Sequence, residues 1–207
     1  MKLFFQYCSY GFSNCYILGA DDTGTQEASG AIIVDPGSME NITLETIENN
    51  NFDIKAVLVT HDHVSHVRGL RTLKRIYNAE VFAVNQSIMD HKATMVKDGD
   101  MFNIAGFTVE VISIPGHSSD SVVYRIRGML FTGDVLTAGL VGSTASAYGA
   151  ATQMNKLRAR LLSLPGDYIV LPGHGPPSTL EAERHFNTEI LNYDQYRTKK
   201  PSFKVDI

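Results

Sequence analysis

The sequence predicts an α/β fold in which two β-sheets pack face to face with helices outside, an αββα sandwich formed as one domain over residues 1–207. Strand-like apolar runs occur in two blocks, each flanked by segments with helical spacing of apolar residues. Hydrophobic residues make up 43% and charged residues 19% of the chain, which permits a sizeable core and argues against disorder. A length of 207 residues fits one large domain or two small ones, and no interdomain linker interrupts the pattern.

The first block begins with a hairpin and continues as alternating strands and helices. The expected strands are 2–8, 14–19, 31–35, 54–60 and 81–84. Helical spacing of apolar residues predicts helices over 42–50 and from about 67 to 77, and the polar segment 21–30 is expected to be a loop.

The second block repeats this alternation, with glycines marking the turns. The expected strands are 102–104, 107–114, 121–126, 129–131 and 168–171, and the expected helices are 150–163 and 179–193. Two strand-rich blocks with helices beside each support the sandwich rather than a single open sheet.

Composition excludes several classes of partner. The net charge is −4 and the charged residues are scattered, so neither a basic stripe for nucleic acid nor a polybasic membrane patch is present. Polar residues interrupt the N-terminal apolar residues, and no apolar run approaches the ~18 residues of a membrane span. We therefore expect a cytoplasmic protein that acts on a small molecule, while no pattern specifies its oligomeric state.

Two cysteines, Cys8 and Cys15, flank the turn of the first hairpin. A disulfide across the hairpin is conceivable. Without a secretory signal, a reducing compartment and two structural thiols are expected instead.

The residues that carry chemistry follow apolar strands. The segment THDHVSH places three histidines within six residues, and three further polar residues each follow a glycine. The set is His61, His63, His66, His117, Asp134 and His174. Loops at one edge of a folded sheet would bring the set together, and imidazole with carboxylate ligands suits zinc, iron or manganese.

Glycines and one further aspartate accompany this set. Gly116, Gly133 and Gly173 permit turns that direct the next residue into the site. Asp35 ends a strand before Pro-Gly, where it serves either as a turn former or as the partner that orients a ligand histidine. Outside the set, His91 and His185 are interpreted as solvated or hydrogen-bonded histidines.

The motifs VDPG, THDHVSH, PGHSSDS, FTGD and PGHGPP, in this order, resemble the metallo-β-lactamase superfamily over roughly residues 12–186. Within it the chain is most similar to glyoxalase II-type enzymes, the hydroxyacylglutathione hydrolases, above all in FTGDVL and VLPGHGPPSTLEAER. The resemblance implies an αββα sandwich and hydrolysis of an ester or thioester by metal-activated water. It also implies one or two zinc ions, with iron or manganese possible.

The resemblance assigns a role to each residue of the set. His61, His63 and His117 would bind a first metal, and Asp134 would bridge to a second metal held by His66 and His174. These assignments rest on the motif positions alone.

Ser65 occupies the position where the superfamily's HxHxDH motif has an aspartate. A neutral hydroxyl is a weak metal ligand, so the second site is expected to be weakened, empty or used by another metal. Ser65 could act as N-cap of a helix beginning near His66, or donate a hydrogen bond to water or substrate during catalysis. Asp62 is a further, less favoured replacement ligand.

Other departures concern the substrate. The segment GLVGSTASAYG replaces a more charged stretch of the family's hydrolases, and the chain is expected to lack their helical glutathione-binding domain. Loops 89–101 and 137–149 would set specificity.

Two alternatives remain beside the hydrolase. One is an oxidoreductase resembling persulfide dioxygenases, with a single iron on His61, His117 and Asp134. The other is a metal-binding protein without catalytic activity.

Overall fold

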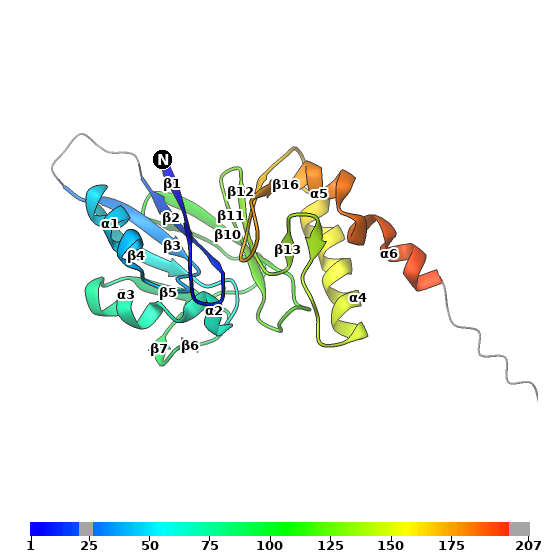
Figure 1. Cartoon of the computed structure of the whole chain (residues 1–207), viewed down its shortest axis with the longest axis horizontal. Helices are drawn as coiled ribbons and strands as arrows, with labels where there is room; N and C mark the ends of the chain where they lie inside the picture. The colour runs from blue at the N-terminus through cyan, green and yellow to red at the C-terminus, as the bar shows by residue number, and fades with distance from the viewer. Residues whose placement is uncertain (21–26, 199–207) are drawn as a thin grey trace, which may run out of the picture.

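In the computed structural model, the ten predicted strands and two short strands that the sequence does not predict form two six-stranded sheets that pack against each other (Figure 1). The structure describes residues 1–20 and 27–198, with only the backbone described at 194–198. Residues 21–26 of the predicted loop therefore lie outside the described residues. Within the described chain the αββα sandwich is confirmed.

The N-terminal sheet has the strand order β1-β2-β3-β4-β5-β8. Its strands are β1 Lys2–Tyr7, β2 Asn14–Gly19, β3 Ser29–Val34, β4 Phe52–Leu58, β5 Glu80–Ala83 and β8 Thr94–Met95. β1 to β3 are antiparallel neighbours, whereas β3, β4 and β5 run parallel. The predicted strands of this block are all present, with ends that shift by one or two residues.

The C-terminal sheet has the order β16-β15-β12-β11-β10-β9. Its strands are β9 Met101–Ile104, β10 Phe107–Ser113, β11 Val122–Ile126, β12 Met129–Gly133, β15 Ile169–Pro172 and β16 Ser178–Thr179. β12 and β15 run parallel, so their carboxyl ends lie at the same edge of the sheet.

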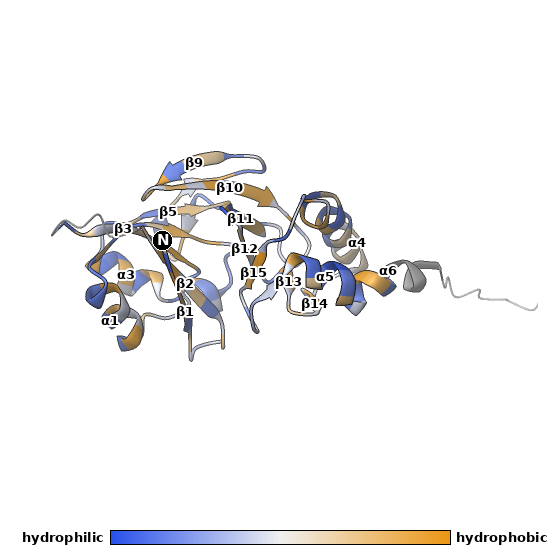
Figure 2. Ribbon diagram, turned by 90° about the horizontal axis from the view of Figure 1, so that it is seen from above, coloured by the Kyte–Doolittle hydropathy of each residue, from blue (hydrophilic) through white to orange (hydrophobic). Residues whose placement is uncertain are grey.

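Strand β2 shows why both faces of the N-terminal sheet are apolar. Every residue of β2 is buried. Cys15 and Ile17 face the helices of the first half, while Tyr16 and Leu18 face the second sheet. The strand is therefore covered on both sides, and Figure 2 shows the apolar strands between the helices.

Helices cover the outer face of each sheet. On the N-terminal side they are α1 Asn41–Asn49, α2 Val64–Val67 and α3 Leu70–Ile76; on the C-terminal side they are α4 Ala147–Lys156, the π-helix Leu157–Leu162, α5 Leu180–Phe186 and α6 Thr188–Thr198. Ile47 and Leu73 enter the first outer core, and Met154 and Leu161 enter the second. No helix in the described part of the chain is long and apolar enough to cross a membrane.

Two predicted helices are divided by tertiary contacts. The helix predicted from about 67 to 77 is two helices, α2 and α3, separated by Gly69, whose amide donates to Pro36 O at 2.8 Å. The helix predicted over 179–193 breaks at the buried Asn187, whose side chain donates to Glu183 at 2.7 Å and accepts from the Glu189 amide at 3.1 Å. Neither predicted helical segment contains a proline.

Four short strands form two small hairpins that the sequence does not predict. They are β6 Ser87–Ile88 with β7 His91–Lys92, and β13 Leu136–Thr137 with β14 Leu140–Val141. The β13–β14 hairpin begins two residues after Asp134. It therefore places the segment 142–144 beside the end of β12.

Candidate metal centre

The six predicted ligands lie together where the loops of the two sheets meet. The loop after β4 carries His61 and His63, and α2 carries His66. The loop between β10 and β11 carries His117. Asp134 and His174 follow the parallel strands β12 and β15, which explains why they reach the same edge.

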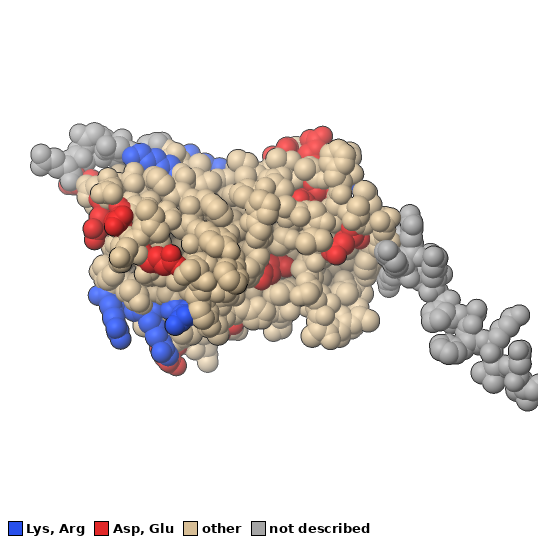
Figure 3. All heavy atoms as spheres, viewed as in Figure 1, with Lys and Arg blue, Asp and Glu red and all other residues tan. Residues whose placement is uncertain are grey.

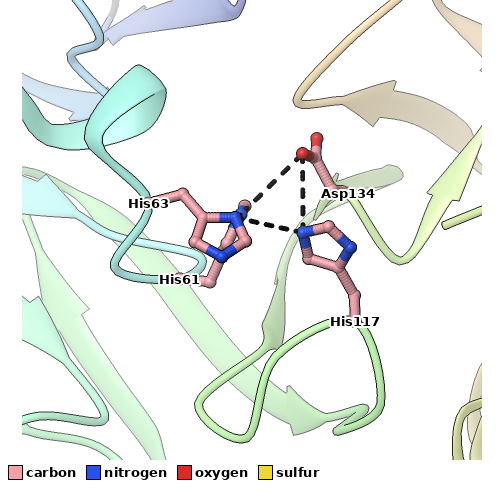
Figure 4. A group of neighbouring side chains, drawn as sticks. All are labelled: His61, His63, His117 and Asp134. Carbon is pink, nitrogen blue, oxygen red and sulfur yellow. Dashed lines mark hydrogen bonds and ion pairs between the residues drawn. The ribbon is translucent and has the colours of Figure 1, made fainter. Parts of the chain in front are cut away.

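The first group consists of His61, His63, His117 and Asp134 (Figure 4), with one ligand atom from each residue within 4.8 Å of every other. His63 Nδ1 lies 2.9 Å from His61 Nε2 and 3.2 Å from His117 Nε2. Asp134 Oδ2 lies 3.8 Å from His61 Nε2 and 3.7 Å from His117 Nε2. Three ring nitrogens and one carboxylate oxygen therefore face a common point.

The second group consists of His66, Asp134 and His174, with the same 4.8 Å limit. Asp134 Oδ1 lies 2.8 Å from His174 Nδ1, and Asp134 Oδ2 lies 3.3 Å from His66 Nε2. Because Asp134 belongs to both groups, its carboxylate connects them.

Backbone carbonyls fix the proton position on two of the histidines. His117 Nδ1 donates to Ser143 O at 2.8 Å, and His174 Nε2 donates to Gly11 O at 3.0 Å. A carbonyl oxygen only accepts, so each of these ring nitrogens carries the proton. When the ring is neutral, the other nitrogen, which faces Asp134, therefore presents a lone pair.

Asp35 fixes the other two buried histidines in the same way. Its carboxylate accepts from His66 Nδ1 at 3.2 Å and from the Thr60 hydroxyl at 2.7 Å. Because the Thr60 hydroxyl donates to Asp35, it accepts from His61 Nδ1, 3.1 Å away. The inward Nε2 of His61 is therefore the lone-pair nitrogen, whereas the inward Nε2 of His66 presents a lone pair only after it loses its proton.

This arrangement fits a cation. Lone pairs aimed at one another and at a carboxylate repel unless a proton or metal ion lies between them. Outer acceptors that orient ring nitrogens in this way are typical of metal-ligating histidines. The described residues therefore fit a metal ion in the first group, and the second group offers two nitrogens and the shared carboxylate.

The pKa values describe the charge balance of the same atoms. Burial, with help from His66, lowers the pKa of His61 to about 3 and so keeps this ring neutral. Burial also opposes protonation of His66, but hydrogen bonds to Asp134 and Asp35 outweigh it and raise the pKa of His66 to about 10. Although burial favours the neutral acid, hydrogen bonds from His174 and His66 hold the pKa of Asp134 well below its usual range. A metal entering the second group must therefore displace a proton from His66.

Two glycines leave no room for a side chain at the centre. Gly133 has φ +49°, and a Cβ there would lie 2.8 Å from Thr60 Cβ. A Cβ on Gly173 would lie 2.5 Å from both Asp134 Oδ1 and His66 Cε1. Gly133 has the left-handed backbone conformation that the predicted turn requires. At position 173 a glycine is required for a different reason, because Asp134 and His66 lie too close to its backbone for a side chain to fit.

The position of Ser65 corrects one expectation. α2 begins at Val64 and its N-cap is His63, with no side-chain hydrogen bond, so Ser65 lies inside the helix and does not cap it. Its carbonyl accepts from Ser13 Oγ at 2.5 Å, and its side chain packs against Gly11, the residue that orients His174. Ser65 therefore adjoins the second group.

Asp62 points away from both groups. Its amide donates to Asp120 Oδ2 at 2.9 Å, and it belongs to neither cluster of possible ligands in the described chain. Asp35 is both of the things expected of it: a buried turn residue with φ +51° and the partner of a ligand histidine.

Sequence reasoning missed the residues that hold the His174 loop. The amide of Asn14 donates to Gly173 O at 2.7 Å, and its side chain donates to Pro172 O at 2.9 Å. Tyr16 Oη donates to the same Pro172 oxygen at 2.7 Å. Each contact spans more than 150 positions and ends on a backbone carbonyl, so no local pattern marks it.

Comparisons with known proteins agree with this site. A curated hydroxyacylglutathione hydrolase of Chromohalobacter salexigens is 35% identical over 153 residues, which cover 72% of this chain and 59% of that enzyme. The hydroxyacylglutathione hydrolase GloC of Haemophilus influenzae is 26% identical over 84% of this chain and 91% of its own length. The chain thus spans well under two thirds of the first relative and nearly all of the second.

A solved structure and a family model cover most of the chain. The structure of TTHA1623 in a di-iron-bound form matches with a TM-score of 0.72 and 26% identity, over 89% of this chain and 98% of that one. The model of the metallo-beta-lactamase superfamily matches residues 9–174, which include every residue of both clusters. The chain therefore belongs to the metallo-beta-lactamase superfamily.

Proposed function

We propose that the protein is a metal-dependent hydrolase that cleaves an ester or a thioester. The observation that carries this proposal is the convergence of five histidine nitrogens on Asp134, with the outer nitrogen of four of these histidines held by an acceptor. The likeness to two hydroxyacylglutathione hydrolases supports a thioester as the substrate class.

The first metal would be held by His61, His63, His117 and Asp134, and a second by His66, Asp134 and His174. Nitrogen and carboxylate donors suit zinc, iron or manganese. The di-iron form of TTHA1623 supports two metals on this fold. Because the hydroxyl of Ser65 supplies no negative charge, we expect the second metal to bind less tightly than the first.

A bound divalent ion would lower the pKa of its water toward ~7 and polarise the carbonyl of the substrate. Hydrolysis then adds the water oxygen to the carbonyl carbon and breaks the bond from carbon to sulfur, giving a carboxylic acid and a thiol. Asp134, whose pKa lies well below its usual range, stays ionised throughout. Thr60 and Asp35 keep His61 and His66 oriented.

We assign Ser65 a supporting role in this reaction. A serine hydroxyl can donate a hydrogen bond to water or substrate, but it is no general base at neutral pH. Its place beside Gly11, next to the second group, is consistent with that role.

The test is hydrolysis of S-lactoylglutathione and S-acetyl-N-acetylcysteamine by protein reconstituted separately with zinc, iron and manganese. We expect thiol release that requires metal and falls at least about 100-fold in the Asp134→Asn variant. Metal-loaded protein that cleaves neither thioester nor a simple ester would refute the hydrolase.

One observation also favours a mononuclear iron oxidoreductase of the persulfide dioxygenase type. His61, His117 and Asp134 all belong to the first group, while the second group has a single, shared carboxylate. Iron in the purified protein, with oxygen uptake on glutathione persulfide and no thioester cleavage, would select this alternative. Protein with neither activity would be a metal-binding protein without catalysis.

A further inference from the structure

A cavity of about 340 Å³ lies behind His117, on the side of its outer nitrogen Nδ1, and is separated from the metal centre by this ring. Its lining includes Ser143, whose carbonyl accepts the hydrogen bond from His117 Nδ1. Its volume holds roughly ten water-sized groups, so a short substrate chain fits. The cavity lies within the predicted specificity loop 137–149 and against α4 and α6.

The wall nearest the ligands is held by a buried glutamine. Gln153 of α4 donates from Nε2 to Gly142 O at 2.9 Å and to Val135 O at 3.3 Å, and its side chain is fully buried. A Cβ on Gly142 would collide with Asp134 O. The cavity wall and the ligand Asp134 are therefore parts of one fixed loop, so the cavity is preformed relative to the metal centre.

Among the lining residues that the structure describes, a single side chain is charged, and its charge is negative. Glu189, in the first turn of α6, accepts from the Val141 amide at 2.5 Å and lines the cavity. No lysine or arginine is among the lining residues of the described chain. Arg158 donates to Ile190 O at 3.0 Å and lies 5.3 Å from the ring centroid of Tyr193, a lining residue.

On the face drawn in Figure 3, Asp and Glu side chains lie over α5 and α6 and also over α1, while Lys and Arg side chains lie near α3 and near β1. An anionic group that enters the cavity would lose hydration and meet the like-charged carboxylate of Glu189.

We propose that this cavity binds the part of the thioester that extends beyond the reacting carbonyl, and that it selects a neutral or cationic group over an anionic one such as glutathione. The inference rests on the proposed hydrolase and names its substrate class. Glu189 is then a specificity-determining residue, while Ser143 positions His117 and borders the substrate.

The test compares acetyl thioesters that share one acyl group and differ in the charge of the thiol. S-acetylthiocholine is cationic, S-acetyl-N-acetylcysteamine is neutral, and S-acetyl-3-mercaptopropionate and S-acetylglutathione are anionic. Hydrolysis by metal-loaded, full-length protein gives acetate and the free thiol, which is measured directly. We expect kcat/KM for the cationic and neutral thioesters to exceed that for the anionic ones by about five-fold or more at low salt, with the difference shrinking in high salt.

Two variants change the charge of the cavity without replacing a residue of the metal centre. Glu189→Gln should lower the ratio of cationic to anionic kcat/KM by about three- to five-fold, and Thr144→Lys, which adds a cation to the lining, should lower it further. Glu181→Gln changes an exposed glutamate of α5 that does not line the cavity, and should leave the ratio unchanged.

The outcomes distinguish this inference from the proposed function. Cleavage that favours the anionic thioesters, or a ratio that Glu189→Gln and Thr144→Lys leave unchanged, overturns the cavity assignment and keeps the hydrolase. Metal-loaded protein that cleaves no thioester of the series overturns the cavity assignment, and if it also cleaves neither S-lactoylglutathione nor a simple ester, it overturns the hydrolase as well.

Discussion

Asp35 lies behind two histidines of the metal centre without being a ligand. Its two oxygens accept from the Thr60 amide at 2.8 Å, from the Thr60 hydroxyl at 2.7 Å and from His66 Nδ1 at 3.2 Å. Through Thr60 it also sets the proton position on His61. One carboxylate thus controls a ligand in each of the two groups.

Asp35→Asn should therefore weaken the metal centre without removing a ligand. The amide nitrogen of asparagine would face donors that now meet Oδ2, so we expect metal affinity to fall by about 10- to 100-fold. We also expect the free energy of unfolding to fall by about 2 kcal/mol, because a buried donor loses its acceptor. Metal titration and urea denaturation measure the two effects. Asp90→Asn, on an exposed carboxylate, is the control; equal metal affinity in both variants would show that Asp35 does not orient the ligands.

We expect Ser65 to limit how strongly the second group binds a metal ion. Ser65→Asp would supply a charged oxygen next to His66, and we expect the second metal equivalent to bind at least about 10-fold more tightly than in the native chain. The neutral Ser65→Asn variant controls for side-chain size. Isothermal titration of metal-free protein measures both sites; identical isotherms for the native and Asp variants would mean that Ser65 lies outside the coordination sphere.

The two cysteines are free, buried and hydrogen-bonded to each other. The hydrogen bond from Cys15 lowers the pKa of Cys8 from 9.0 to about 6, and the same contact raises the pKa of Cys15. The contribution of Cys8 to stability is therefore full above pH 9 and is lost as the pH falls through 6. Because the pKa of Cys15 is raised, its contribution to stability is full below pH 9 and is lost as the pH rises above 9.

As the pH rises from 6 to 9, the free energy of unfolding of the native chain should therefore increase relative to that of Cys15→Ala. We expect an increase of about 0.5 kcal/mol per pH unit after allowance for solvent screening. Urea denaturation of both proteins at pH 6.5, 7.5 and 8.5 checks this. A difference that is constant over this range would show that no thiolate is stabilised at Cys8.

The ligands were predictable as single residues, whereas their orientation was not. Three histidines in THDHVSH and the glycine-flanked His117, Asp134 and His174 are visible in the sequence, and the structure brings all six together. The acceptors Ser143 O and Gly11 O are backbone atoms of distant segments, and a backbone atom leaves no mark on the sequence. The interpretation of Ser65 as an N-cap is wrong. Serine favours that position in general, but the helix begins at Val64 and its N-cap is His63.

At the scale of elements, the local pattern of apolar residues predicted the limits of the strands more accurately than those of the helices. β2 has the predicted limits because a continuous apolar run ends at Gly19. The breaks at Gly69 and Asn187 depend on contacts with Pro36 and Glu183. Such contacts arise only after the chain has folded, so apolar periodicity predicts one continuous helix in each case.

Gly133 connects strand β12 to the metal centre, and its replacement should affect both. Gly133→Ala forces a side chain into a left-handed backbone conformation and into contact with Thr60. We expect a loss of about 2 kcal/mol or more in the free energy of unfolding, together with weaker metal binding. Gly128→Ala is the matched control, because a Cβ there meets nothing within 4 Å, and it should change stability by about 0.5 kcal/mol or less. Equal effects of the two variants would contradict this reading of Gly133.

At the scale of the whole molecule, each half supplies part of the centre. His61, His63 and His66 come from the first half, and His117, Asp134 and His174 from the second. The site therefore exists only when the two sheets are packed, and metal binding should stabilise the folded protein by linkage. The αββα sandwich was predictable because two blocks of strands and helices alternate along the chain, but the cavity beside His117 was not, because it depends on how α6 packs against β14.

The most direct measurement is the number of metal equivalents per chain, by mass spectrometry, in protein purified without chelator or added metal. The native chain should carry at least one equivalent of zinc, iron or manganese, with any second equivalent present in a smaller amount. Asp134→Asn, which removes the carboxylate shared by both groups, should carry markedly less. A folded native chain with almost no metal, which also fails to bind zinc, iron or manganese on titration, would contradict the metal centre and the hydrolase built on it.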